Sequence, residues 1–437
     1  MLSTLSPRSG RVRTHHTGPP VLSRYGRVLA FLDWCLEESR AMGSRMDLDF
    51  VDGAFWGRDP QDELAWCRAH DPVHWDGQVW GVTKHADVRY VATRPELFSS
   101  AQGIRPDQGP VAMMIDMDDP QHLLRRKLVA TGFTPRRVVE QEAAVLDLTD
   151  RIIDRVCERG ECDLVRDVAA WLPIEVIGRA LGFAEQDFGT LLDWSDTLLS
   201  ALVGVADEET TMRLMAAFEG YTGYVTGAVA ERRATPTDDL ISILVHAEVD
   251  GQRLSDEDLV HESLLILIGG DETSRHVMSG GVYQLLKDRE QWEKLRADRA
   301  LLPGAVEEML RWVSPIKNMA RTATEDTVLG GKEIEAGQKL LLLYPSANRD
   351  EEVFADPFRF DITRTPNEHL AFGVGPHFCL GNALARVEVR TMLDRLLERL
   401  PDLELVEPEE PAFRPANFVS GYESLPVRFT PTEPVRG

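Results

Sequence analysis

A single cysteine, Cys379, lies in a glycine-rich stretch, AFGVGPHFCLGNALAR, at residues 371–386. Gly373 and Gly375 precede the cysteine and Gly381 follows it. Glycine tolerates positive φ and close backbone approach, so the stretch predicts a tight loop around something bulky. Apolar residues recur at helical spacing after this loop, which therefore leads into a helix N-terminus. Backbone N–H groups and the helix dipole stabilise a thiolate there, which suits an axial ligand of a haem iron.

A second reactive group lies in the middle of a long helical pattern at residues 255–287, whose centre reads GGDET (269–273). Two glycines inside a helix cost roughly 1 kcal/mol each relative to alanine, so they need a reason. The Thr273 hydroxyl can bond the carbonyl of Gly269, four residues earlier, and bend the helix. Together with the Glu272 carboxylate, this alcohol could relay protons to oxygen bound in the resulting groove. The alternative is a kinked packing helix with a buried acid.

Other charged side chains are spaced so that they share helix faces. His122 and Arg126 are four residues apart, and Glu308 and Arg311 are three apart. Each pair by itself is more typical of a solvated helix surface than of a site.

The composition limits the function and the compartment. The chain has 437 residues, 43% of them hydrophobic, and a net charge of −24, which argues against nucleic-acid binding. The five cysteines show no disulfide framework, and no apolar run reaches the ~20 residues that span a bilayer. We therefore expect a cytoplasmic protein. Residues 1–45 are rich in Arg, Ser, Pro and Gly and are interpreted as a disordered extension or a mis-assigned start, followed by a single domain at 46–437.

The pattern of apolar residues predicts a mainly helical protein with small sheets. The predicted helices cover residues 84–93, 144–157, 168–181, 188–203, 212–233 and 255–287, and predicted strands lie at 78–82, around Ile334, and at 340–343 and 427–429.

The spacing F-G-x-G-x-H-x-C-x-G around Cys379 resembles the haem loop of the cytochrome P450 monooxygenases, and the central helix resembles their oxygen-activation motif. The resemblance covers residues 46–432. It implies the P450 fold, a triangular prism of helices around haem b, and a reaction that uses O2, two electrons and two protons, the latter delivered through Thr273 and Glu272. The haem contacts that it implies, besides the iron ligand Cys379, are His122, Arg126, Arg321, His377, Phe372 and Gly373.

The same resemblance assigns a structural triad, in which Glu308 and Arg311 pair with a later arginine, Arg359. It also implies a separate electron donor, a ferredoxin with its ferredoxin reductase. Basic residues concentrated at 125–127 and 136–137, with Arg386 and Arg390 nearby, are the predicted docking surface for that donor.

Several stretches are closer still to the actinobacterial steroid C26/C27-monooxygenases, among them GIRPDQGPVAMMIDMDDPQHLLRRKLV, LLILIGGDETSRH and RPANFVSGYESLPVRFTP. This implies hydroxylation of the terminal methyl of a cholesterol or cholest-4-en-3-one side chain, with further oxidation to the acid left open. The expected substrate pocket is apolar and comprises Ile104, Met114, Leu265, Ile268, Gly269 and Val419. Alternatives are hydroxylation of a macrolide, terpenoid or fatty acid, or a haem-thiolate protein that only binds or senses a ligand.

Overall fold

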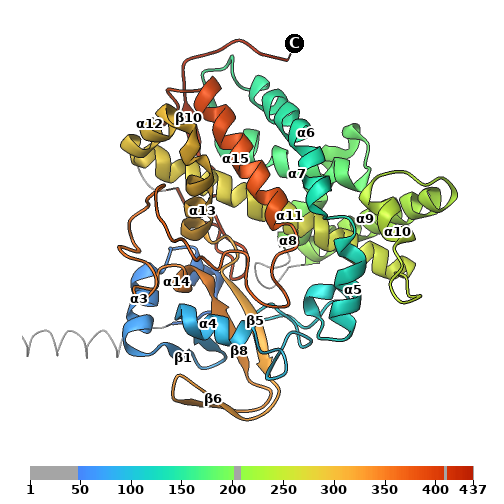
Figure 1. Cartoon of the computed structure of the whole chain (residues 1–437), viewed down its shortest axis with the longest axis vertical. Helices are drawn as coiled ribbons and strands as arrows, with labels where there is room; N and C mark the ends of the chain where they lie inside the picture. Colours follow the sequence, from blue (N-terminus) through green and yellow to red (C-terminus); the bar gives the residue numbers. More distant parts are fainter. Residues whose placement is uncertain (1–47, 201–207, 408–410, 437) are drawn as a thin grey trace, which may run out of the picture. The chain divides into compact units, whose positions relative to one another are not determined.

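The computed structural model describes residues 48–200, 208–407 and 411–436. The predicted extension at 1–45 and the end of the helix predicted at 188–203 lie outside these residues. The described chain is mainly helical with small sheets, as the sequence predicted (Figure 1). The helices before residue 250 are α2 (Gly53–Trp56), α3 (Gln61–His70), α4 (His85–Ala92), α5 (Gln121–Ala130), α6 (Pro135–Asp154), α7 (Trp171–Leu181), α8 (Phe188–Ser200), α9 (Glu208–Ala234) and α10 (Leu240–His246).

The remaining helices follow residue 255. They are α11 (Asp256–Lys287), α12 (Arg289–Ala297), α13 (Leu302–Val313), α14 (Tyr344–Ala347) and α15 (Asn382–Arg399), and short helical turns lie at η1 (Met114–Asp116), η2 (Leu164–Ala169), η3 (Glu185–Asp187) and η4 (Arg299–Leu301). In Figure 1, α15 crosses in front of α11, which also contacts α7, α9 and α13.

The central helix α11 begins at a complete capping box. The Ser255 hydroxyl accepts from the Asp258 N–H, and the Asp258 carboxylate accepts from the Ser255 N–H. Most of its residues are buried, which explains the nearly continuous apolar run after Leu259. The helix is one unbroken element, so the residues at its centre are held on a rigid support.

The strands form three small sheets. The largest has the order β1-β2-β8-β5-β3, in which β2 and β8 are parallel and the other neighbours are antiparallel. A second has the order β4-β10-β9, and β6 pairs with β7. Their bounds are β1 (Val73–Trp75), β2 (Trp80–Val82), β3 (Phe98–Ser99), β4 (Glu161–Asp163), β5 (Asn318–Ala323), β6 (Thr327–Leu329), β7 (Lys332–Ile334), β8 (Lys339–Leu343), β9 (Glu404–Leu405) and β10 (Pro426–Arg428).

None of the helices within the described ranges is long and apolar enough to cross a membrane.

Candidate functional site

The loop before α15 holds Cys379 mainly through its backbone. Gly373 and Gly375 have positive φ, and a Cβ on Gly375 would lie 2.7 Å from the carbonyl oxygen of Ala92. The Cys379 N–H donates to the carbonyl of Phe372 (2.9 Å), which closes the loop. The local prediction of a tight glycine loop is therefore confirmed.

The sulfur of Cys379 lies at the N-terminus of α15. Burial raises the pKa of the thiol, while the backbone N–H groups of Gly381 and Asn382 and the charges of Arg126 and Arg386 act in the opposite direction. These donors favour a thiolate once a cation faces the sulfur, which is the chemistry that an iron ligand requires.

The two predicted histidines lie together. The rings of His122 and His377 are 4.1 Å apart between centroids, and His377 Nε2 is 3.2 Å from the hydroxyl of Ser100. His122 Nδ1 lies 3.2 Å from Asp119, whereas its Nε2 is buried and has no hydrogen-bond partner in the described chain. A buried polar atom of this kind needs an acceptor or donor from elsewhere.

The two predicted arginines also have no carboxylate partner among the residues described. Arg126 donates to the carbonyl of Phe378, the residue before Cys379. Arg321 on β5 is only 4% exposed and donates to the carbonyl of Ala320 (2.7 Å). A buried guanidinium without a carboxylate is costly, particularly in a chain of charge −24. With the free Nε2 of His122, the donor set fits a group that carries two carboxylates, as haem does.

On α11, one face is uncovered at the predicted groove. Gly269 is exposed in the middle of a buried helix, and a Cβ there would meet no atom of another segment within 4 Å. The Thr273 hydroxyl donates to the Gly269 carbonyl (2.8 Å), as predicted. Leu265 and Ile268 are also only partly buried. These residues form one open face on which a ligand can rest.

Glu272 does not stand free beside Thr273 but is 1% exposed and held by two side chains that sequence reasoning missed. Arg414 forms an ion pair with its Oε1, and His276 Nε2 lies 3.6 Å from the same atom. Burial opposes the charge, yet His276 and Arg414 together keep the pKa of Glu272 below its ordinary value. The signal for His276 was its spacing of four residues from Glu272, whereas nothing local indicates Arg414.

The predicted pocket residues fall into two neighbouring apolar clusters. Ile104 and Val419 pack with Phe418, and Met114 belongs to the main core. Ile115 packs against both clusters and so connects them. A bridge between Ile316 and Val419 brings the turn at 414–421 back to the segment before β5.

The assignment of Arg359 to the triad is wrong. Glu308 and Arg311 are fully buried and paired through two contacts of 2.7 and 2.8 Å. The backbone at Arg359 turns its carbonyl towards Arg311, which donates to it. The side chain of Arg359 is exposed to solvent and takes no part in the pair. The third member is Arg364, whose Nε lies 3.1 Å from Glu308.

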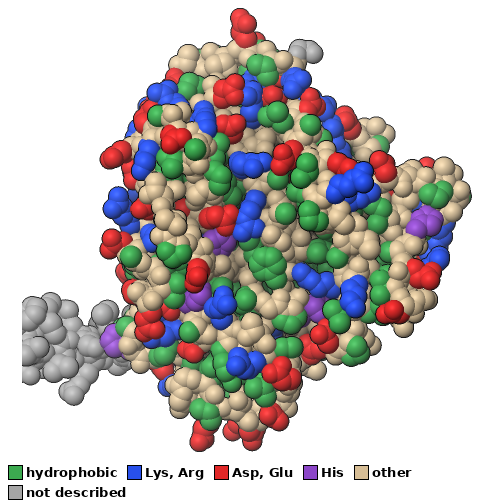
Figure 2. All heavy atoms as spheres, viewed as in Figure 1, with side chains coloured by type: hydrophobic (Ala, Val, Ile, Leu, Met, Phe, Trp, Pro, Cys, Tyr) green, Lys and Arg blue, Asp and Glu red, His purple; other side chains and the backbone are tan. Residues whose placement is uncertain are grey.

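The predicted basic docking surface is largely neutralised by acidic neighbours. Arg125 pairs with Asp258 (2.6 Å) and Glu262 (3.2 Å) and does not face solvent freely, contrary to the prediction. Arg136, Arg386 and Arg390 are also in ion pairs, with Glu140, Glu307 and Glu142. On the face with α5, α6 and α15, basic side chains are interspersed with acidic and hydrophobic ones (Figure 2). Lys127 is exposed and has no ion-pair partner in the described ranges.

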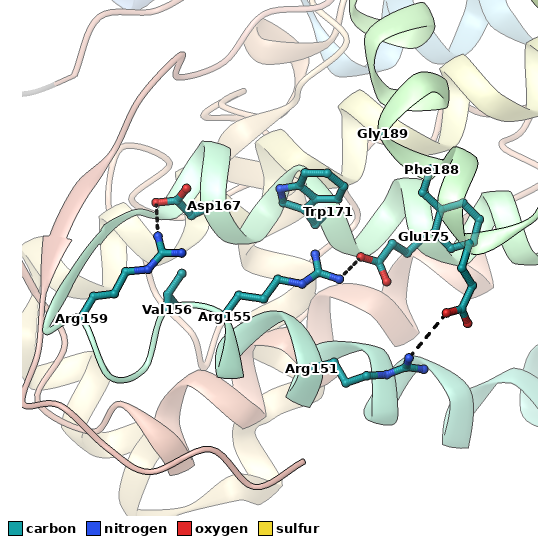
Figure 3. A pocket seen from close by; sticks show the side chains of 10 residues that line it. Arg151, Arg155, Val156, Arg159, Asp167, Trp171, Glu175, Phe188 and Gly189 are labelled. Atoms are coloured by element: carbon teal, nitrogen blue, oxygen red, sulfur yellow. Dashed lines mark hydrogen bonds and ion pairs between the residues drawn. The ribbon is translucent and has the colours of Figure 1, made fainter. Parts of the chain in front are cut away.

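A groove of about 450 Å³ between α6 and α7 contains none of the predicted residues (Figure 3). Three ion pairs cross it, Arg155–Glu175 (2.6 Å), Arg151–Glu185 (3.9 Å) and Arg159–Asp167 (4.0 Å). Arg155 also lies over the ring of Trp171. The charges in this groove neutralise one another, so we interpret it as a surface feature.

Comparisons with known proteins agree on one family. The family model described as Cytochrome P450 matches residues 198–421. A protein of Mycolicibacterium smegmatis named steroid C26-monooxygenase is 54% identical over 396 residues, which are 90% of this chain and 99% of that one. A methyl-branched lipid omega-hydroxylase of Mycobacterium tuberculosis is 39% identical over 433 residues, 96% of this chain and 98% of that one. The solved structure of CYP109E1 of Bacillus megaterium with testosterone has a TM-score of 0.79 at 34% identity, and covers 85% of this chain and 99% of its own.

Proposed function

Since the chain belongs to the cytochrome P450 family and is a haem b monooxygenase, we propose that it hydroxylates the terminal methyl group of a steroid side chain. The observation that carries this proposal is the 54% identity to a steroid C26-monooxygenase over nearly the full length of both chains. The apolar clusters around Ile104 and Met114 support it, because a hydrocarbon side chain offers no charge to bind. Oxidation of the alcohol to the acid remains part of the proposal.

In this proposal, Cys379 ligates the iron and the N–H groups at the start of α15 hold its sulfur as a thiolate. His122, Arg126 and Arg321 bind the two haem carboxylates. His377 and the loop at Phe372 and Gly373 make further contacts with the haem. The bound haem supplies the iron at which O2 is reduced and its bond is split.

The chain's own contribution to the reaction lies on α11. The open face at Leu265, Ile268 and Gly269 positions the apolar substrate and excludes water from it. The Thr273 hydroxyl delivers the proton at this face, and Glu272 Oε1 is the group before it on the proton path. Arg414 fixes the carboxylate of Glu272 in place.

A ferredoxin, itself reduced by a ferredoxin reductase, is the proposed electron donor, and we propose that the protein works in the cytoplasm. The contact of Arg126 with Phe378 places α5 against the cysteine loop. Lys127, Leu123 and Phe378 are exposed there, the last two at 45% and 39%. A protein with an acidic rim and an apolar centre suits this mixture of side chains.

The substrate proposal is tested with purified holoprotein and cholest-4-en-3-one. We expect a shift of the Soret band from low to high spin on titration, and a product hydroxylated at the end of the side chain by mass spectrometry. A methyl-branched fatty acid is the matched comparison, since the 39% identical relative acts on such lipids by its name. A spin shift and product with the fatty acid but not with the steroid would contradict the proposal.

A further inference from the structure

We propose that His276 carries protons from a water-sized cavity near the surface to Glu272, a role that rests on the proposed monooxygenase function. Glu272, His276, Gly280 and Gln284 follow one another at intervals of four residues on α11. They therefore lie on one stripe of the helix, about 18 Å long from first to last. The stripe begins beside Thr273 and ends in the wall of the cavity.

The cavity at the outer end of this stripe has a volume of about 30 Å³. By this measure it has room for about two water molecules. Its walls include Asp59, Gln61, His276, Gln284, Lys317 and Arg349. The side chain of Asp59 is exposed, so this wall meets solvent.

Polar atoms around this cavity have no protein partners within the described chain. His276 is 2% exposed, and neither of its ring nitrogens makes a hydrogen bond. Gln61 Oε1 is likewise buried without a partner. Because buried polar atoms are almost always hydrogen-bonded to protein or ordered water, these two side chains point to water as their partner.

Of the two side chains that contact Glu272, only the imidazole can exchange a proton. Arg414 contacts the carboxylate through a guanidinium, a group that has no acceptor atom and does not relay protons, so it orients the carboxylate but does not supply it with protons. His276 Nε2 lies 3.6 Å from Glu272 Oε1, just beyond hydrogen-bonding distance. The only route by which a proton reaches Glu272 through its direct side-chain contacts in the described chain is therefore His276.

The transfer balances as an exchange across the ring. A water in the cavity gives a proton to Nδ1 and regains one from bulk solvent at the exposed wall by Asp59. At the same time Nε2 releases its proton to Glu272 Oε1, which passes it towards Thr273. The ring is left as the Nδ1–H tautomer and returns to the Nε2–H tautomer before the next transfer. Nδ1 lies on the side of Gly421, which also lines the cavity, and a Cβ at Gly421 would stand 2.3 Å from that nitrogen. A side chain at residue 421 would collide with the ring, so glycine lets this segment pack against His276.

Burial favours the neutral form of the His276 ring, and the charges that face it act in both directions. Burial lowers the pKa of His276, Glu272 raises it, and Arg414 and Arg275 lower it further. Across the cavity, burial lowers the pKa of Lys317 to about 8, so its ammonium group also exchanges protons near neutral pH. His276 acts only through Glu272, to which it supplies protons.

The first test is a high-resolution crystal structure of the holoprotein. We expect ordered water in the cavity, within hydrogen-bonding distance of His276 Nδ1 and Gln61. A dry cavity overturns the proposal. This readout needs no substrate, so it is independent of whether the steroid proposal holds.

The second test compares His276→Phe with His246→Phe, a histidine exposed at the end of α10. With any substrate that the wild type hydroxylates, we expect His276→Phe to lower product per NADH consumed by on the order of tenfold. The solvent deuterium isotope effect should rise, while the substrate dissociation constant and the first electron-transfer rate stay unchanged. His246→Phe should match the wild type.

If His276→Phe loses haem, His276→Gln replaces it, since glutamine keeps a polar side chain but does not titrate. Equal coupling and equal isotope effects in the His276 and His246 variants overturn the proposal.

Discussion

The loop that carries Cys379 and the part of α11 that carries Glu272 are built in different ways. The cysteine is fixed by positive-φ glycines and by backbone hydrogen bonds within its own loop and the first turn of α15. Glu272 is fixed by a side chain from a segment 142 residues away. The first arrangement depends on local backbone geometry, and the second on long-range side-chain pairing, so the two should respond differently to single substitutions.

The largest expected effect follows from replacing the cysteine itself. Cys379→Ala removes the iron ligand, so we expect the red-shifted Soret band of the reduced, CO-bound protein and all hydroxylation to disappear. The matched control is Cys162→Ala, a partly buried cysteine on β4 that should keep both. A CO spectrum of unchanged position in Cys379→Ala would show that the thiolate comes from elsewhere.

Breaking the buried Glu308–Arg311 pair should have an effect almost as large, but on the free energy of unfolding. Arg311→Met leaves Glu308 buried without its closest partner, so we expect a loss of about 3–5 kcal/mol in the free energy of unfolding in urea. Arg359→Met, at an exposed position, should stay within about 0.5 kcal/mol of the wild type. Comparable losses for both would reinstate Arg359 as the third member of the triad instead of Arg364.

The same contrast explains what could be predicted from the sequence. The glycine loop, the helix at 255–287 and the Thr273–Gly269 hydrogen bond depend on residues close in the chain, and all three were predicted. Helix α6 begins at Pro135, although its apolar pattern starts only at residue 144, because its first turns face solvent. Periodicity detects the buried face of a helix and misses turns that have none.

Which side chains from distant segments pair with one another could not be predicted from the sequence. Arg359 and Arg364 are equally plausible partners of Glu308 until the turn between them is known, and that turn exposes one and buries the other. Likewise, nothing in the sequence indicates that the arginine of the turn at 414–421 would hold Glu272. Neither assignment follows from spacing, because both depend on where two distant segments meet.

Removing the long-range partner of Glu272 should have an intermediate and pH-dependent effect. Arg414→Leu leaves Glu272 buried with His276 alone, so we expect a loss of about 3 kcal/mol near neutral pH. The pKa of Glu272 lies below its ordinary value in the folded protein, so its contribution is present above the unfolded pKa of about 4.5 and is lost as pH falls through the folded pKa. The difference between wild type and variant should therefore shrink in acid.

Unfolding in urea between pH 8 and about pH 3, which extends below the unfolded pKa, measures this difference. Arg428→Leu is the control, because its pair with Glu404 is exposed on both sides and should contribute little at any pH. A destabilisation by Arg414→Leu that is independent of pH would mean that lost packing, and not the charge of Glu272, is responsible.

The smallest expected effect concerns the surface beside the cysteine loop, where most of the basic charge is already paired. Lys127 on α5 is exposed and unpaired in the described chain, so reversing it changes the local field more than reversing a neutralised arginine does. We expect Lys127→Glu to slow the first electron transfer from a reduced ferredoxin by a few-fold at low salt, measured by stopped flow, and to leave substrate affinity unchanged. The difference should fade above physiological ionic strength, where the Debye length drops below ~8 Å.

Arg136→Glu, whose wild-type charge is matched by Glu140, is the control and should have a smaller effect. Equal rates for Lys127→Glu and the wild type at low salt would place the docking surface on another face.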